Sequence, residues 1–378
     1  MTPAETYFDY AASAPPFPGA LRAQQEAAAA FFANPSATHA AGREAWRELA
    51  RLREALTAMC RFDGRLVLTS GATEANNLAI HGVMRRQPRA RLLVAADTHA
   101  SVWEACGRYG RQREAVPLRP DGTLALAAVA ARLTPGVALF CCSHVANETG
   151  AIHDVAALAS LCERRGARCL IDGSQALGHV PVDLSAVACD FYTFSAHKFG
   201  GPRGLGGLFA RSAPGEAILD GGRQQWGLRP GTENLPGLAG ATEALRLSLE
   251  SMAEETRRLR DLAARLAARL TSAGIRTLTN GDPRHGLPGF VSVSFPDLNG
   301  HTLAADLALR GFSVATGAAC HAETPEPPRA ILALGRTPAE ALGTVRISLG
   351  RLTAPAAVEA LAEALIETVR RHAALTGG

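Results

Sequence analysis

One lysine stands where a buried strand ends and a turn begins. Lys198 follows the run FYTFSAH and precedes a Gly-Gly-Pro turn at 200–202, a place poorly suited to a salt bridge on a helix. Buried beside other cations, such an amine has the lowered pKa with which a Schiff-base lysine attacks an aldehyde. An ordinary surface lysine at a strand end is the alternative, and this segment alone leaves both open.

A carboxylate ends another apolar run. Asp172 comes 26 residues before Lys198, directly after the letters CLI. At the C-terminal end of a central parallel strand, a carboxylate lies at the ligand crevice of an open α/β sheet. There it could keep the pyridine nitrogen of pyridoxal phosphate protonated, so that the ring serves as an electron sink. A cap on the following turn is the alternative.

A third segment, LTSGATEANNLAI, joins a short strand to a helix that begins near Thr73. Free N–H groups at a helix start favour a phosphate, and the Thr73 hydroxyl adds a donor; plain helix capping is the alternative. The sequence has neither GxGxxG nor GxxxxGK[ST], which argues against a dinucleotide or a nucleoside triphosphate. A helix start that binds phosphate, then an aspartate, then a lysine is the order that pyridoxal-phosphate enzymes of the aspartate-aminotransferase-like fold need.

Apolar runs and helical segments alternate along the middle of the chain, which predicts an α/β domain with a mostly parallel sheet covered on both faces. The predicted strands are Arg65–Thr69, Arg91–Ala95, Val137–Cys142, Arg168–Ile171 and Phe191–Phe194. The predicted helices between them are Thr73–Arg86, Thr123–Leu133 and Ile152–Arg165. Gly204–Ala210 follows its preceding strand too closely for a helical crossover, so we expect an antiparallel strand there.

The last third of the chain has a different pattern. A long helical segment without Gly or Pro, Ala241–Ala273, is followed by strand-like Phe290–Phe295 and Val345–Gly350. Further helices are expected at Thr302–Arg310 and Ala354–His372. Helices and strands without regular alternation predict a smaller α+β domain.

Composition excludes several classes of protein. The 378 residues carry a net charge of only +4 and 5% aromatic residues, which argues against direct nucleic-acid binding. No apolar run is long enough for a membrane helix, and the first residues have no signal-peptide pattern. The eight cysteines form no CxxC pair, which is unlike a metal site or a disulfide framework and fits a cytoplasmic protein.

Motifs along nearly the whole chain resemble the class V aminotransferase family, specifically its cysteine desulfurase branch. They include YFDYAASAP, TSGATEANNLAI, VANETG, DGSQALGHVPVD, SAHKFGGPRG, GLRPGTEN, ATGAAC and RISLGR. The resemblance implies fold type I of the pyridoxal-phosphate enzymes, with a mostly parallel seven-stranded sheet. It implies a large domain at 15–245 and a small domain at 1–14 and 246–378.

The resemblance also implies a pyridoxal 5'-phosphate site. Lys198 would attach the cofactor, Asp172 would pair with its ring nitrogen, Gln175 would bond its phenolic oxygen, and His99 would stack on the ring and act as an acid or base. The residues expected to hold the phosphate are Thr73, Ser195, His197 and Thr232. Because Thr232 would reach the phosphate of a neighbouring subunit, a homodimer is expected.

The resemblance assigns the substrate and the sulfur as well. Asn147 and Arg346 would hold the carboxylate of L-cysteine, a task for which the planar fork of arginine is suited. Cys320 lies in the Gly/Ala-rich and then Pro-rich stretch VATGAACHAETPEPP. It would take the sulfur as a persulfide, release L-alanine and pass the sulfur to an acceptor protein. We interpret Cys141, Cys142, Cys169 and Cys189, which lie in or near apolar runs, as core thiols.

Departures from the family pattern keep other activities open. Ala318 replaces a common serine before Cys320, His321-Ala322 replaces small hydroxyl residues after it, and Pro230 replaces a serine in RPGTEN. The alternatives are a selenocysteine lyase, another class V lyase or aminotransferase, or a low-activity scaffold in a sulfur-transfer complex. The sequence leaves the acceptor and its pathway open, including iron–sulfur cluster assembly, thiolation and cofactor sulfuration.

Overall fold

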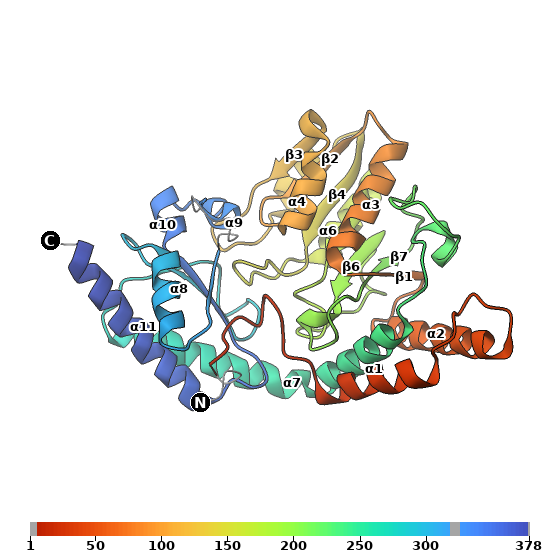
Figure 1. The fold of residues 1–378 in the computed structure, drawn as a ribbon. Helices are drawn as coiled ribbons and strands as arrows, with labels where there is room; N and C mark the ends of the chain where they lie inside the picture. Colours follow the sequence, from red (N-terminus) through yellow and green to blue (C-terminus); the bar gives the residue numbers. More distant parts are fainter. Residues whose placement is uncertain (1–5, 318–325, 377–378) are drawn as a thin grey trace.

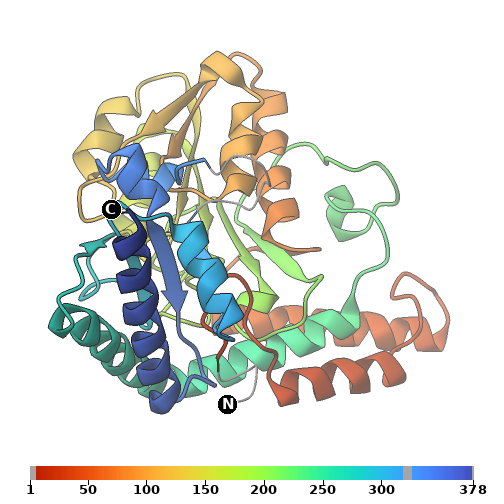
Figure 2. The ribbon, with the colours of Figure 1, turned by 60° about the vertical axis from the view of Figure 1, so that its left-hand side comes forward.

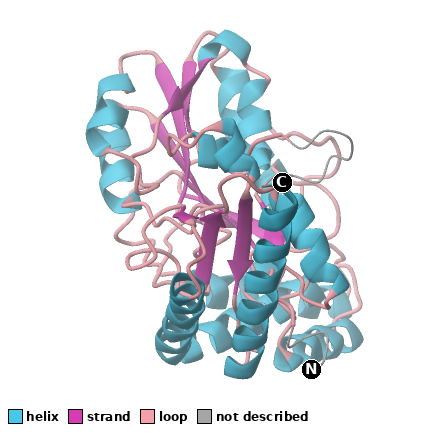
Figure 3. Cartoon of the chain, turned by 90° about the vertical axis from the view of Figure 1, so that its left-hand side faces the viewer, coloured by secondary structure: helices cyan, strands magenta, loops and turns pink. Residues whose placement is uncertain are grey.

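The computed structural model describes residues 6–317 and 326–376, so Cys320 and the departures at 318–322 lie outside the described residues. Two sheets lie side by side, and helices surround both of them (Figures 1 and 3). Within the described part, no helix has the length and apolar character needed to cross a membrane.

The larger sheet has seven strands in the order β1-β7-β6-β5-β4-β2-β3. β7 runs antiparallel to both of its neighbours, while the strands from β6 to β3 are parallel to one another. The strands are β1 (Arg65–Thr69), β2 (Arg91–Ala95), β3 (Arg113–Val116), β4 (Val137–Ser143), β5 (Arg168–Asp172), β6 (Phe191–Ser195) and β7 (Gly206–Ala210). The predicted mostly parallel sheet with one antiparallel strand is confirmed.

Both faces of this sheet are covered because successive strand residues point to opposite sides. In β2, Leu92 and Val94 pack into one core with α3 and α4, whereas Leu93 packs into the other core with α1, α2, α6 and α7. The helices that cover the two faces are α1 (Pro18–Ala30), α2 (Ala40–Met59), α3 (Ala72–Arg86), α4 (Ala100–Gly107), α5 (Leu126–Arg132), α6 (Val155–Arg165) and α7 (Leu235–Ser272). Three short 3₁₀ turns are η1 (Gly110–Gln112), η2 (Ala196–Lys198) and η3 (Gln225–Gly227).

The smaller sheet has four antiparallel strands in the order β10-β11-β9-β8. Its strands are β8 (Leu278–Thr279), β9 (Phe290–Ser294), β10 (Ala315–Thr316) and β11 (Thr344–Ser348), and its helices are α8 (Gly300–Leu309), α9 (Arg329–Leu332), α10 (Pro338–Leu342) and α11 (Pro355–Thr376). The N-terminal segment joins this part of the molecule, because Tyr7 bridges to Ser313 and Asp9 bridges to Ser348.

α7 connects the two parts of the molecule. Its first half packs against α1 and α2 and its second half against α11, so it runs beneath both sheets (Figures 1 and 2). Leu245 belongs to a core of the large sheet, whereas Leu262 belongs to the core of the small one. The division at residues 14/15 and 245/246 stays a prediction.

Several bounds differ from the prediction. α7 begins at Leu235, ahead of the predicted Ala241, because proline is tolerated in the first turn of a helix and Asn234 caps it by accepting from the Gly237 amide. α5 begins at Leu126 rather than at Thr123. β3 was not predicted, since its sequence REAV is short and half-charged; it is held by parallel pairing with β2.

Candidate active site

A cavity of about 230 Å³ opens at the carboxyl ends of β4, β5 and β6, next to the start of α3. It lies where ligand sites are expected in open α/β sheets. The structure brings together eight of the predicted site residues there. They are Thr73, His99, Asn147, Asp172, Gln175, Ser195, His197 and Lys198.

Asp172 ends β5 and is held by three hydrogen bonds. Its Oδ1 accepts from the Ser174 backbone N–H at 3.0 Å and from the Ser174 hydroxyl at 2.6 Å. Its Oδ2 accepts from Asn76 Nδ2 at 3.0 Å. The carboxyl group is therefore buried and fixed in the cavity by these three hydrogen bonds.

Lys198 lies in the η2 turn directly after β6, and its amine donates to the carbonyls of Ala11 at 2.7 Å and Ala12 at 3.0 Å. Burial, together with the nearby Arg346 cation, lowers the pKa of Lys198 to about 8, although Asp172 opposes the shift. A substantial fraction of the amine is therefore neutral near pH 8, as a nucleophilic lysine requires. Lys198 is also the only lysine of the chain, since every other one of its 39 Lys and Arg residues is arginine.

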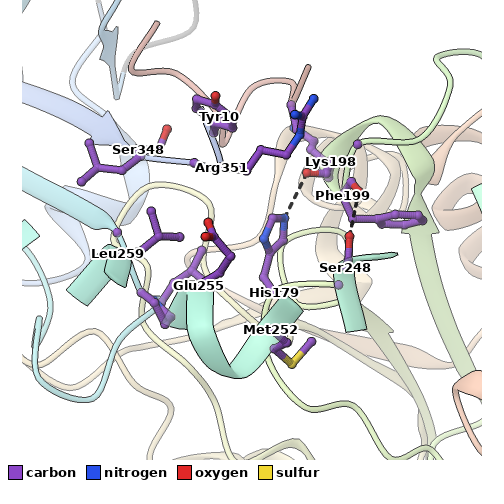
Figure 4. A pocket seen from close by; sticks show the side chains of 18 of the residues that line it. Tyr10, His179, Lys198, Phe199, Ser248, Met252, Glu255, Leu259, Ser348 and Arg351 are labelled. Atoms are coloured by element: carbon purple, nitrogen blue, oxygen red, sulfur yellow. Dashed lines mark hydrogen bonds between the residues drawn. The ribbon is translucent and has the colours of Figure 1, made fainter. Parts of the chain in front are cut away.

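A second cavity, of about 90 Å³, lies behind Lys198 (Figure 4). Its walls come from α7, the N-terminal segment and the ends of β9 and β11. His179 reaches across it, and its Nε2 hydrogen bonds the Lys198 carbonyl at 3.0 Å. Burial lowers the pKa of His179, so the neutral ring donates to that carbonyl and fixes the backbone of the lysine.

Next to the start of α3, the first cavity presents the hydrogen-bond donors of three side chains. Ser195 Oγ accepts from the Ala72 backbone N–H at 2.8 Å, which leaves its own hydrogen available, and Thr73 lies beside it in the first turn of α3. His197 Nδ1 lies 3.2 Å from Ser13 Oγ. Burial and the neighbouring Lys198 and Arg203 cations lower the pKa of His197 to about 4, so this ring is neutral near pH 7.

His99 follows β2 and caps α4, with Nδ1 accepting from the Ser101 backbone N–H at 3.1 Å. His99 is exposed to solvent at the cavity, yet partial desolvation of its ring by the surrounding protein lowers its pKa, while the negative charge of Asp172 opposes this shift. Gln175 is held by its Nε2, which donates to the Ala11 carbonyl at 2.7 Å. That amide nitrogen keeps a second hydrogen with which it can donate to a ligand.

Arg346 stands beside the cavity in the middle of β11. Its Nη1 donates to the Asn147 carbonyl at 3.0 Å, and its Nη2 pairs with Asp9 Oδ1 at 2.8 Å. Its Nε is buried and has no hydrogen-bond partner among the described residues. The guanidinium therefore already binds one carboxylate, that of Asp9, and its Nε–H remains a donor for a further group.

Thr232 does not lie in the cavity. It is exposed in the loop between η3 and α7. That loop is tied to the start of α3, because Arg229 Nε donates to Glu74 Oε1 at 2.9 Å and Glu74 Oε2 accepts from the Ser70 N–H at 2.7 Å. The seven described cysteines are all buried and free, so the interpretation of Cys141, Cys142, Cys169 and Cys189 as core thiols is confirmed.

The structure adds residues that the sequence reasoning missed. Asn76 is completely buried, and besides Asp172 it bonds Ser101 Oγ at 3.0 Å and Thr193 Oγ1 at 2.7 Å. A polar residue among buried apolar residues of α3 is the signal that could have identified it. Glu148, next to Asn147, has a buried Oε2 without a partner in the described part of the chain. Burial raises the pKa of Glu148 to about 7.

Known proteins share this sequence and this fold. The family model Aminotransferase class-V matches residues 6–361. The chain belongs to that family. Among its class-V relatives are a cysteine desulfurase of Cereibacter sphaeroides, 36% identical over 98% of this chain and 97% of that protein, and the cysteine desulfurase IscS of Proteus mirabilis, 33% identical over 97% of this chain and 93% of that protein.

Solved structures of class-V relatives have the same architecture. A NifS-like protein superposes with a TM-score of 0.89 at 26% identity, covering 97% of this chain and 99% of that one. DndA from Streptomyces lividans superposes with a TM-score of 0.76 at 31% identity, covering 91% of this chain and 99% of that one. The predicted resemblance to the cysteine desulfurase branch and the predicted fold are confirmed.

Proposed function

We propose that this member of the class-V aminotransferase family is a pyridoxal-phosphate-dependent cysteine desulfurase. It would take the sulfur of L-cysteine onto Cys320 and release L-alanine. The observation that carries the proposal is the cavity itself. It joins a buried carboxylate, a lysine with a pKa of about 8 and a set of neutral donors at a helix start, with an arginine beside it.

The donor set of the cavity fits pyridoxal phosphate. Thr73, Ser195 and His197 present hydroxyl and imidazole donors near the start of α3, which suits a phosphate. Asp172, held in place by three hydrogen bonds, suits a protonated pyridine nitrogen, and Gln175 keeps an N–H for a phenolic oxygen. When bound, the cofactor supplies an electron sink for negative charge at an amino-acid α-carbon.

The remaining residues would bind the substrate and move its protons. Arg346 and Asn147 would hold the carboxylate of L-cysteine, since Arg346 already pairs with the carboxylate of Asp9. The Lys198 amine would attach the cofactor and then carry protons at the substrate α-carbon, with His99 as a further acid or base. The Cβ–S bond breaks, the sulfur joins the Cys320 sulfur as a persulfide, and the carbon skeleton takes up a proton to leave as L-alanine.

We further propose a cytoplasmic homodimer that delivers sulfur to an acceptor protein. Thr232 is exposed and would complete the phosphate site of a second copy. Trp46 and Trp226 line one groove together with Glu233, the neighbour of Thr232, and are 59% and 51% exposed. Aromatic residues of this size are enriched where a partner covers the surface. The free thiols among the described residues suit a reducing compartment.

Product analysis tests this function. The purified protein loaded with pyridoxal phosphate should convert L-cysteine to equimolar L-alanine and sulfide when dithiothreitol is present. Cys320→Ala should keep the visible absorbance of the bound cofactor and lose both products, whereas the buried-thiol control Cys189→Ala should keep them. Full activity in Cys320→Ala contradicts the persulfide step. Turnover of selenocysteine alone, or amino transfer to a keto acid, would assign the protein to one of the alternatives.

A further inference from the structure

Arg329 begins α9, in the C-terminal part of the chain, yet its guanidinium lies against the end of β2. Its Nε donates to the Ala96 carbonyl at 2.8 Å, and its Nη2 donates to the Thr98 carbonyl. These two carbonyls lie three residues and one residue before His99. The contacts therefore fix the backbone from which the His99 ring projects into the cavity.

Arg329 also contacts the helix that follows His99. Its guanidinium carbon lies 3.8 Å from the ring centroid of Trp103, in the first turns of α4. Arg113 stacks on the same indole at 4.3 Å. Arg329 thus touches the chain on both sides of His99, through hydrogen bonds before it and through a cation–π contact after it.

Two buried acidic groups face Arg329. Asp97 Oδ2 accepts from His153 Nε2 at 2.7 Å, and both side chains are fully buried. His153 Nδ1 accepts from the Leu124 N–H at 3.2 Å, so the hydrogen of the neutral ring is on Nε2. Asp97 Oδ1 and Glu148 Oε2 have no hydrogen-bond partner in the described chain, and both carboxylates raise the pKa of Arg329 against the effect of burial. The cation therefore compensates charge in this corner of the site.

We propose that Arg329 is a positioning residue that holds the chain on both sides of His99 and so sets the place of its ring. The proposal deepens the proposed function, because it assumes that His99 acts in the reaction. It also predicts that lysine is a poor substitute. A lysine can neutralise the same carboxylates, but its single ammonium cannot span two carbonyls and stack flat on an indole as the planar fork does.

The protonation of His99 gives a readout that does not depend on catalysis. Four charged groups face its ring: Asp172 raises its pKa, and Lys198, Arg329 and Arg346 lower it. Removing the charge of Arg329 should therefore raise the pKa of His99. In protein labelled with carbon-13 histidine, NMR titration should show this rise in Arg329→Gln, with His99→Gln used to assign the signal.

Arg329→Lys and Arg329→Gln are compared with Arg336→Gln. Arg336 is a matched control because it donates to the Thr279 carbonyl at 2.7 Å and does not line the cavity. In the loaded enzyme we expect kcat for L-cysteine to fall about tenfold in Arg329→Gln, with a smaller change in KM, because a misplaced acid–base group affects the chemical step. The kcat of Arg329→Lys should lie between those of the wild type and Arg329→Gln, and the kcat of Arg336→Gln should match the wild type.

Tryptophan emission reports the geometry directly. In a Trp46→Phe, Trp226→Phe background Trp103 is the remaining indole, and losing the stacked guanidinium should shift its emission in Arg329→Gln and Arg329→Lys but not in Arg336→Gln. The proposal is overturned if Arg329→Gln leaves the His99 titration and the Trp103 emission as they are in the control. It is also overturned if kcat falls only in proportion to unfolded protein. A wild type that makes no alanine contradicts the proposed function, while the two spectroscopic tests still decide the positioning role.

Discussion

The part of the cavity proposed to hold the cofactor, the cofactor end, and the part proposed to hold the substrate, the substrate end, are built in different ways. At the cofactor end, Asp172, Ser195 and Lys198 follow from consecutive strands of one sheet, and α3 begins beside them. Beside the substrate end, Arg346 reaches the Asn147 carbonyl from the C-terminal part of the chain, and Arg329 reaches the segment that leads to His99. Arg346 bonds a carbonyl 199 residues away, and Arg329 bonds one 233 residues away.

The difference matches the two tasks. A cofactor that stays bound through every turnover needs donors fixed by a buried sheet, whereas a substrate that enters and leaves needs groups that can exchange partners. Arg346 pairs with the carboxylate of Asp9, a group of the same kind as the carboxylate of an amino acid. Removing a group at the cofactor end should therefore abolish cofactor attachment, whereas removing a group beside the substrate end should only change the rate or its pH dependence.

The largest expected effect is at the cofactor end. Lys198→Ala should abolish covalent attachment of pyridoxal phosphate, because the chain holds no other lysine. Borohydride reduction followed by peptide mass analysis should find the cofactor on the Lys198 peptide of the wild type and on no internal peptide of the variant. A normal visible absorbance in Lys198→Ala would refute the assignment.

A graded effect is expected from Arg346→Gln. Arg346 is one of the cations that lower the pKa of Lys198, so its removal should raise that pKa above about 8. The neutral amine is the reactive form, so the pH profile for uptake of pyridoxal phosphate by the cofactor-free protein should shift to higher pH. Stopped-flow absorbance between pH 6 and pH 10 measures it, with Arg336→Gln as the control. An unchanged or downward-shifted profile contradicts the electrostatic account.

The smallest effect concerns stability. The pKa of Glu148 is raised from 4.5 to about 7 in the folded protein, so the folded state binds the proton more tightly than the unfolded chain. The stabilisation from this proton is present below pH 4.5 and is lost as the pH rises to about 7. Glu148→Gln, which cannot ionise, should be about 1–2 kcal/mol more stable than the wild type at pH 8 and about equal to it at pH 4.5. Urea unfolding at both pH values measures the difference in unfolding free energy between Glu148→Gln and the wild type. The same difference at pH 4.5 and pH 8 would contradict the raised pKa of Glu148.

The same contrast explains what the sequence could predict. The rule that strand ends meet at one edge of a parallel sheet is local, and it placed Thr73, Asp172 and Lys198 together. Asn76 and Arg329 were missed because their partners are set by how distant segments pack, which no local pattern encodes. One compositional signal was overlooked: a chain that uses arginine everywhere else keeps a single lysine.

Locating a sulfur label shows whether Cys320 receives the sulfur of L-cysteine. The loaded enzyme is incubated with L-cysteine carrying a heavy sulfur isotope, alkylated and digested without reductant. One extra, labelled sulfur atom should appear on the peptide that contains Cys320 and none on the seven buried cysteines. Labelled sulfur on another cysteine, or L-alanine formed with no labelled peptide, would contradict sulfur transfer to Cys320.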